Sequence, residues 1–297
     1  MHLIRSHGLG NDYLVLTSGE PMSPARARAL CDRHRGVGGD GVLEPVPTED
    51  GVYGLRIWNP DGSLAEKSGN GLRIFAWFLH RHREAGPALV VRLHAPGPVG
   101  EARCRVWPDH AEVEVEMGVA SLAPAQIPAL GPLDRAPLSL GPAGPTLPCT
   151  AIGLGNPHCV VFAEDLPHGW AEAGPGPLLD RLPWRSWGPL LEAHPHFPRR
   201  TNVQFAQVIG EDVVAARIWE RGAGETLASG SSACAVAVAA VHQGRIAARP
   251  EANGWVDVRV EMPGGALAVR VGPGLGVRQR GPVEELARVE TLWPVPC

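Results

Sequence analysis

The sequence predicts an α+β protein of two pseudo-symmetric domains, each a mostly antiparallel sheet wrapped around a central helix. Three observations lead to this fold class. An internal repeat divides the chain, each copy of the repeat joins a strand to a helix through a Ser-Gly pair, and strand-like alternations surround both helices.

The repeat is defined by two short motifs that recur in the same order. Arg56-Ile57-Trp58 precedes Ser68-Gly69, and Arg217-Ile218-Trp219 precedes Ser229-Gly230, with both pairs of motifs 161 residues apart. A further Gly-Leu-Gly-Asn motif begins at Gly8 and again at residue 153, 145 residues later. Different offsets indicate an old duplication whose connecting loops have changed in length.

Hydrophobic periodicity then predicts the individual elements. Alternation predicts strands over residues 53–58, 112–117, 213–219 and 256–260, and helical spacing predicts helices over 72–82 and 233–243. The second helix is so rich in Ala and Val that it must be buried. Pro and Gly are frequent in two further stretches, interpreted as a link between the halves (123–148) and a decorated loop in the second half (166–198).

Composition restricts the function. The net charge of −4 favours neither nucleic acid nor an anionic surface as a partner, and no apolar run is long enough to span a membrane. The six cysteines form no C-x-x-C pair, so we expect a reduced, cytoplasmic protein. Two pairs of histidines have H-x-H spacing, His80/His82 and His194/His196, but neither pair has a third metal ligand nearby, so we expect no metal. Lys67 is the only lysine, which argues against a Schiff-base cofactor enzyme.

The repeated helix starts are candidates for chemistry. A helix N-terminus presents free N–H groups and attracts anions, and small residues after Ser68 and Ser229 would let a carboxylate approach the backbone. Inversion of a stereocentre needs two groups, one to remove a proton and one to return it on the opposite face. The alternative is that both serines are ordinary helix N-caps.

Six blocks of the sequence resemble the diaminopimelate epimerase family, in the family's order. They are HGLGND (7–12), CDRHRGVGGDG (31–41), RIWNPDGSLAEKSGNG (56–71), GNPHCVV (155–161), TNVQF (201–205) and RIWERGAGETLASGSSACA (217–235). The resemblance implies two domains, 1–120 plus 276–297 and 121–275, with the C-terminal strand returning to the first domain and the site in the cleft between them.

The resemblance also implies roles for particular residues. Ser68 and Ser229 fall on the two acid/base positions, and His158 and Glu220 fall on the residues that support them. Glu220 also belongs to the implied substrate-binding set, which is Asn11, Asn59, Gly69, Asn70, Asn156, Asn202, Glu220, Arg221, Gly230 and Ser231. The implied activity is cofactor-independent epimerisation of LL- to meso-diaminopimelate in lysine biosynthesis, by two-base proton transfer on a free amino acid. A homodimer is compatible with the resemblance.

Two departures from the family pattern bear on activity. Family members carry cysteine at both acid/base positions, and an alcohol is a weaker acid than a thiol by about 7 pKa units, or about 10 kcal/mol. The serines are therefore either isosteric replacements, native residues working slowly through His158 and Glu220, or the mark of a non-catalytic amino-acid-binding homologue. Gly41 stands where relatives usually have Gln, so a racemase or lyase of another amino acid is a further alternative.

Overall fold

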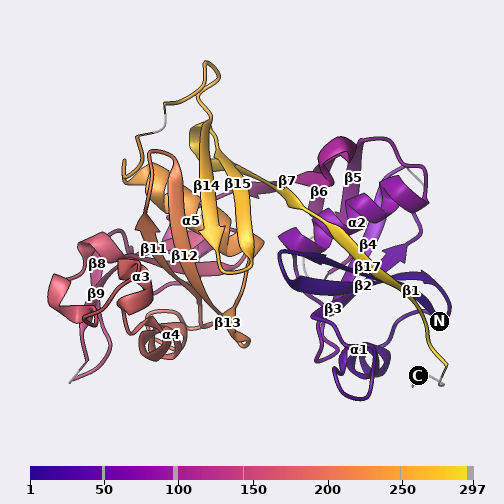
Figure 1. Ribbon diagram of the computed structural model, residues 1–297, viewed down its shortest axis with the longest axis horizontal. Coiled ribbons are helices and arrows are strands. Elements are labelled where there is room, and N and C mark those ends of the chain that lie inside the picture. Colours follow the sequence, from indigo (N-terminus) through magenta and orange to yellow (C-terminus); the bar gives the residue numbers. More distant parts are fainter. Residues whose placement is uncertain (49–50, 96–99, 143, 248, 293–297) are drawn as a thin grey trace. The chain divides into compact units, whose positions relative to one another are not determined.

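The computed structural model describes residues 1–48, 51–95, 100–142, 144–247 and 249–292. The chain forms two compact units, and in Figure 1 the yellow C-terminal strand β17 (Glu284–Glu290) lies with the indigo N-terminal strands. Unit 1 comprises Met1–Glu116 and Arg280–Cys297, and unit 2 comprises Met117–Gln279. The boundary falls inside two strands, β7 (Glu112–Val119) and β16 (Gly276–Pro282).

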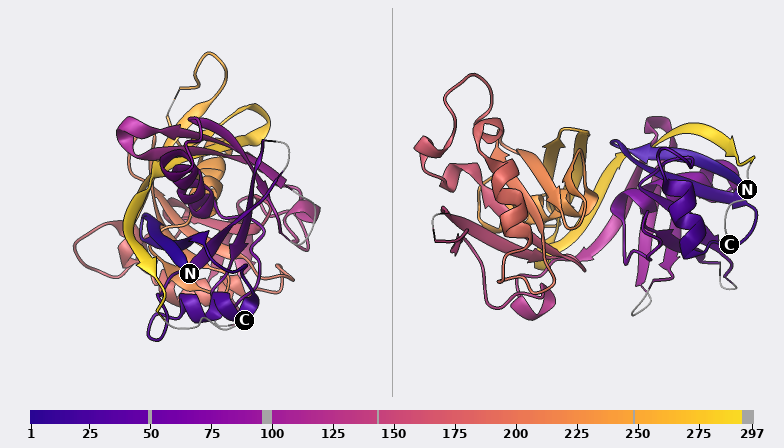
Figure 2. Two further views of the ribbon diagram at one scale, coloured as in Figure 1. Left: turned by 90° about the vertical axis from the view of Figure 1, so that its right-hand side faces the viewer. Right: turned by 90° about the horizontal axis from the view of Figure 1, so that it is seen from below.

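Unit 1 is a mixed sheet curved around one long helix, α2 (Gly69–His82), as Figure 2 shows. The helix contacts β1, β2, β5 and β6 of this sheet. A second helix, α1 (Pro24–Cys31), packs on β3. Besides β7, the strands are β17 (Glu284–Glu290), β1 (His2–Gly8), β2 (Asn11–Ser18), β3 (Gly41–Val46), β4 (Tyr53–Trp58), β5 (Ala88–Leu93) and β6 (Gly100–Trp107).

Unit 2 is built in the same way around α5 (Gly230–His242), which contacts β9 to β12, β14 and β15. Two short helices, α3 (Leu178–Arg181) and α4 (Trp184–Glu192), pack against β11 and β12. The strands are β8 (Ala136–Ser139), β9 (Thr146–Gly153), β10 (Pro157–Phe162), β11 (Asn202–Val208), β12 (Val213–Glu220), β13 (Gly224–Thr226), β14 (Val256–Met262) and β15 (Gly265–Val271).

The pairing order of the strands repeats between the units. From β1 to β6, neighbouring strands pair antiparallel, parallel, antiparallel, parallel and antiparallel. The strands β9, β10, β11, β12, β14 and β15 pair in the same order. The Gly-Leu-Gly-Asn motifs occupy the equivalent first turns, where Gly10 (φ 87°) and Gly155 (φ 85°) adopt left-handed backbone. The predicted α+β fold with two related domains is confirmed.

Both central helices begin earlier than hydrophobic periodicity predicts. The first starts at Gly69 rather than Leu72, and the second at Gly230 rather than Ala233, each directly after its repeated serine. Glycine disfavours helix interiors, so the Gly-rich first turns carry a weak helical signal. A side-chain cap from Ser68 supports the first turn of α2. The second helix is buried along Ala233 to Ala240, as its Ala- and Val-rich sequence predicts.

Two predictions about Pro-rich segments are wrong. Residues 123–148 are not a link between the halves, because they lie within unit 2, where β8 pairs with β9. Residues 166–198 are more than a loop, because they include α3 and α4. Trp184, Trp187 and Leu191 point from α4 into the core of unit 2, which fixes the segment by burial of large apolar side chains.

None of the helices in the described part of the chain combines the length and hydropathy of a transmembrane span. Five cysteines, 31, 104, 149, 159 and 234, are buried free thiols. Cys297 lies outside the described residues. The histidines of the H-x-H pairs each bond elsewhere: His80 to the Ala85 carbonyl, His82 to Glu285, and the pair at 194 and 196 to backbone carbonyls.

Candidate active site

Ser68 caps the first central helix and carries a second hydrogen bond. Its backbone is extended (φ −134°, ψ 120°), and its Oγ accepts the Gly71 N–H at 3.0 Å. The Tyr13 hydroxyl lies 3.0 Å from the same oxygen. The side chain is half-buried. The N-cap interpretation therefore holds for Ser68. The oxygen that caps the helix, which is the candidate proton-transfer atom, also accepts a hydrogen bond from the phenol of Tyr13.

Ser229 has the same backbone but a different side-chain partner. Its angles (φ −142°, ψ 125°) match those of Ser68, yet its side chain makes no capping bond to α5. Its Oγ instead donates to Oε2 of Glu220 at 3.3 Å, and the hydroxyl of Thr226 donates to Oε1 at 2.8 Å. The hairpin of β12 and β13 places these groups, because it pairs Glu220 with Gly224 and Ile218 with Thr226. A carboxylate is thus fixed beside the second candidate atom.

His158 is a fully buried, neutral imidazole. Burial, and secondarily the charge of Arg221, lowers the pKa of His158 from 6.5 to about 3. Gln204 Nε2 lies 3.1 Å from Nδ1 and also donates to Ser232 Oγ at 3.0 Å. With Gln204 as the donor, Nε2 carries the proton and donates to Asn156 Oδ1 at 2.8 Å. The ring is therefore held in one tautomer from both sides.

In unit 1 a chain of side-chain amides connects two of the predicted binding residues. Asp40 Oδ2 accepts from Asn11 Nδ2 at 2.8 Å, and Asn11 Oδ1 accepts from Asn70 Nδ2 at 3.0 Å. A carboxylate can only accept, so Asp40 sets the orientation of both amides in turn. Asp40 is itself paired with Arg33 at 2.7 Å. Asn11 and Asn70 are thereby brought together beside the start of α2.

The other predicted binding residues bond to nearby backbone and turn groups. Asn59 donates to Ser63 Oγ at 3.0 Å inside a tight turn. Buried Asn202 donates to the Pro157 carbonyl and accepts the backbone N–H of Arg221, both at 3.0 Å. The guanidinium of Arg221 is exposed and lies 3.3 Å from the Arg199 carbonyl. The structure thus joins Asn202 to Arg221 and places Asn59 in a separate turn.

The helix starts present small residues, as predicted. Gly69 and Asn70 are buried at the start of α2, and Gly230 and Ser231 begin α5, where a helix has N–H groups without intrahelical acceptors. Gly230 is required by packing as well, because a Cβ there would lie 2.5 Å from the amide oxygen of buried Gln279. These turns can receive a carboxylate through backbone N–H groups and the helix dipole.

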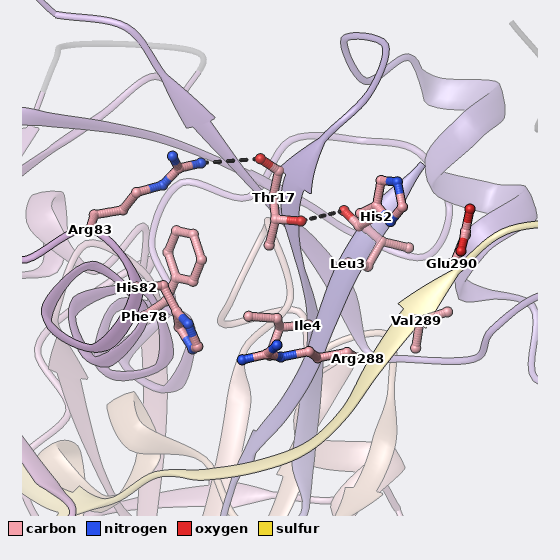
Figure 3. A pocket seen from close by; sticks show the side chains of 10 residues that line it. All are labelled: His2, Leu3, Ile4, Thr17, Phe78, His82, Arg83, Arg288, Val289 and Glu290. Carbon is pink, nitrogen blue, oxygen red and sulfur yellow. Dashed lines mark hydrogen bonds between the residues drawn. The ribbon is translucent and has the colours of Figure 1, made fainter.

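A separate cavity of about 550 Å³ lies in unit 1 and contains none of the predicted site residues. Figure 3 shows it between the end of α2, which contributes Phe78 and His82, and side chains of β1 and β17, such as Ile4 and Arg288. On its rim Arg83 donates to the Thr17 carbonyl at 3.1 Å.

Within the described ranges, no group of three or more His, Cys, Asp or Glu side chains is arranged to hold a metal ion. The chemistry available at the two helix starts is that of the hydroxyl, carboxylate, imidazole and backbone N–H groups described above.

Sequence reasoning missed four polar partners in the site: Tyr13, Asp40, Gln204 and Thr226. Three of them had a detectable signal. Asp40 and Gln204 lie inside motifs that carry the family resemblance, and Gln204 shares a strand face with Asn202, two residues before it. Thr226 lies inside the motif 217–235 that also carries Glu220 and Ser229. Tyr13 had none, since its contact with Ser68 depends on the packing of β2 against α2.

The family model for diaminopimelate epimerase matches residues 3–123 and 150–282. The chain is 37% identical to diaminopimelate epimerase of Pelotomaculum thermopropionicum, over 96% of this chain and 97% of that protein. It is 41% identical to the Synechococcus sp. enzyme of the same name, over 90% and 89%. A solved hydroxyproline epimerase from Agrobacterium vitis shares the fold (TM-score 0.65) at 16% identity, over 97% of this chain and 91% of that one.

Proposed function

Because the chain belongs to the diaminopimelate epimerase family, we propose that it inverts the α-carbon of a free amino acid, with LL- and meso-diaminopimelate as substrates. The family consists of isomerases, and the curated relatives reported above carry the name of this activity. The reaction is two-base proton transfer without a cofactor. On this proposal the protein acts in lysine biosynthesis in the cytoplasm, and a homodimer remains a prediction.

The observation that carries the proposal is the matched pair of helix starts. Ser68 and Ser229 have the same backbone conformation, each directly precedes a buried helix, and each Oγ contacts a further polar group, the hydroxyl of Tyr13 or the carboxylate of Glu220. Two equivalent proton-transfer atoms are what inversion requires, because one must act on each face of the substrate. Each helix N-terminus also has N–H donors of the kind that bind a carboxylate.

The roles of the partners follow from their contacts. As the Cα–H bond breaks, Ser229 Oγ takes the α-proton, and its own O–H bond breaks as that hydroxyl proton passes to Glu220. Glu220 becomes neutral, and its negative charge is transferred to the substrate carbanion. Thr226 holds the carboxylate in position for this transfer. We assign neutral His158 to supporting the other proton-transfer group, and Asn11, Asn59, Asn70, Asn156, Asn202 and Arg221 to binding the amino acid.

The serines make the chain a slow catalyst. An alkyl alcohol is harder to ionise than a thiol by about 10 kcal/mol, and a helix N-terminus returns at most about 2 kcal/mol. We therefore expect turnover lower by orders of magnitude than that of the Ser68→Cys/Ser229→Cys variant. An amino-acid-binding homologue without catalysis is the second candidate, favoured by the absence of both thiols.

The test compares the parent with the Ser68→Cys/Ser229→Cys variant in D₂O, with diaminopimelate stereoisomers and a panel of other amino acids. Mass spectrometry follows deuterium at Cα, and chiral chromatography follows inversion. We expect exchange and inversion of diaminopimelate by the double variant. Saturable binding of an amino acid by both proteins, with no exchange in either, would instead establish the binding homologue. Exchange restricted to another amino acid would replace the substrate assignment.

A further inference from the structure

Tyr13 lies against the proton-transfer position of unit 1. The residue is buried, with 7% of its surface exposed, and its hydroxyl is 3.0 Å from Ser68 Oγ. A phenol is more acidic than an alkyl alcohol, so the phenol is the donor in this pair. Ser68 Oγ also accepts the Gly71 N–H at 3.0 Å. One oxygen thus receives two hydrogen bonds.

Gly41 is what allows the tyrosine ring to occupy this place. The two residues are partners in the parallel pairing of β2 with β3. A Cβ at position 41 would lie 2.7 Å from Cε1 of Tyr13 and 2.5 Å from the carbonyl oxygen of Trp58. No side chain fits beside the ring without a shift of ring or backbone. The absence of a side chain at Gly41 is therefore matched to the position of the tyrosine ring.

We propose that Tyr13 is a positioning residue that lowers the pKa of the proton-transfer group at position 68, in a pocket opened by Gly41. This inference rests on the proposed function, which gives position 68 its role. Both lone pairs of the Ser68 oxygen are used by Tyr13 and Gly71, so the hydroxyl hydrogen must point away from them. When the side chain of residue 68 is deprotonated, the Tyr13 hydroxyl and the Gly71 N–H donate hydrogen bonds to the resulting anion and stabilise it.

The phenol keeps its own proton throughout the reaction. In the direction of reaction in which residue 68 is the base, the Cα–H bond breaks and the anionic atom of residue 68 gains that proton, while the electron pair stays on the substrate carbanion. Tyr13 donates its hydrogen bond to residue 68 both before and after this proton transfer. It contacts residue 68 and does not contact the reacting carbon. It acts by stabilising the anion, and its removal should change the pH dependence of the step.

The test measures the thiol pKa at position 68 in the Ser68→Cys variant, from the pH dependence of iodoacetamide alkylation located by mass spectrometry. The parent protein, with its six cysteines, supplies the blank. Loss of one donor to an anion corresponds to a rise of about one pKa unit, or about a tenfold lower thiolate fraction at pH values below that pKa. We expect this rise on Tyr13→Phe, which removes one oxygen. Tyr53→Phe, at the other tyrosine of the sequence, should leave the thiol pKa unchanged.

The fold of unit 1 is monitored in the same samples. Burial raises the pKa of Cys31 and Cys104 to about 12, so both should stay unalkylated while the unit is intact. Gly41→Ala supplies a second variant, in which the ring is displaced and the thiol pKa should rise in the presence of Tyr13. An unchanged thiol pKa in an intact Tyr13→Phe variant overturns the inference, as does an equal rise in Tyr53→Phe.

Deuterium exchange separates this inference from the proposed function. In the Ser68→Cys/Ser229→Cys background, Tyr13→Phe should move the acidic limb of the exchange rate to higher pH by about the same unit. If the double variant exchanges no amino acid while the thiol pKa still responds to Tyr13, the proposed function fails and the hydrogen-bonding role stands. If exchange occurs and neither quantity responds to Tyr13→Phe, the inference fails and the proposed function stands.

Discussion

The buried histidine of unit 2 makes the stability of the protein depend on pH. The pKa of His158 is about 3 in the folded chain, against an ordinary value of 6.5, because burial disfavours the charged ring. Between these values the unfolded chain binds a proton that the folded chain does not. The contribution of neutral His158 to the free energy of unfolding is therefore fully present above pH 6.5, and it is lost as the pH falls toward 3. The difference of 3.5 units, at 1.36 kcal/mol each, amounts to about 5 kcal/mol.

His158→Gln tests this reasoning, because glutamine keeps hydrogen-bonding capacity and does not titrate. Urea unfolding is followed by tryptophan fluorescence between pH 4 and 6, where Trp184 and Trp187 report on the core of the same unit. The free energy of unfolding should rise with pH more steeply in the parent than in the variant, by about 1 kcal/mol per pH unit. The comparison uses slopes, so a constant loss of stability in the variant does not affect it. If the free energy of unfolding had the same pH dependence in the parent and in the variant, the assignment of a His158 that stays neutral in the folded protein would be refuted.

Two further substitutions test the site and its packing. In the Ser68→Cys/Ser229→Cys background, Glu220→Gln should reduce exchange at Cα by about 10² to 10⁴-fold, because the second proton-transfer group loses its proton acceptor, and an unreduced rate would remove Glu220 from the mechanism. Gly41→Ala should lower the free energy of unfolding by about 1 to 3 kcal/mol, since its Cβ would lie 2.5 Å from the Trp58 carbonyl oxygen. Gly86→Ala is the matched control, because a Cβ there meets nothing within 4 Å; equal losses in the two variants would contradict the steric argument.

The duplicated architecture was largely predictable from sequence, because each copy of the repeat carries its own local signals. The Ser-Gly pairs mark the starts of α2 and α5, and the Ala- and Val-rich run from Ala233 predicts a buried helix, which the structure confirms. The failures fall where proline obscured those signals. Pro137 lies in β8, a short strand that pairs with β9. Trp184 and Trp187 have helical spacing, but Pro183 and Pro189 suggested a loop.

The candidate site was predictable only in part. The family motifs predicted a set of site residues, and the structure brings together Ser229 with Glu220 and Asn11 with Asn70. The contact of Tyr13 with Ser68 joins residues 55 positions apart through packing that no local pattern describes. The same holds for Gly41, whose space is taken by a side chain of another strand. Contacts of this kind join residues of different elements, so they depend on how the strands and helices pack against one another.

The central claim is that positions 68 and 229 are the two proton-transfer groups of an epimerase. The most direct measurement is Cα-deuterium incorporation from D₂O into each stereoisomer of diaminopimelate by the two single variants, Ser68→Cys and Ser229→Cys. The two-base account predicts that each single variant labels a different stereoisomer without inverting it, and that the double variant labels and inverts both. Labelling of the same stereoisomer by both single variants, or no labelling of any amino acid by the double variant, would contradict it.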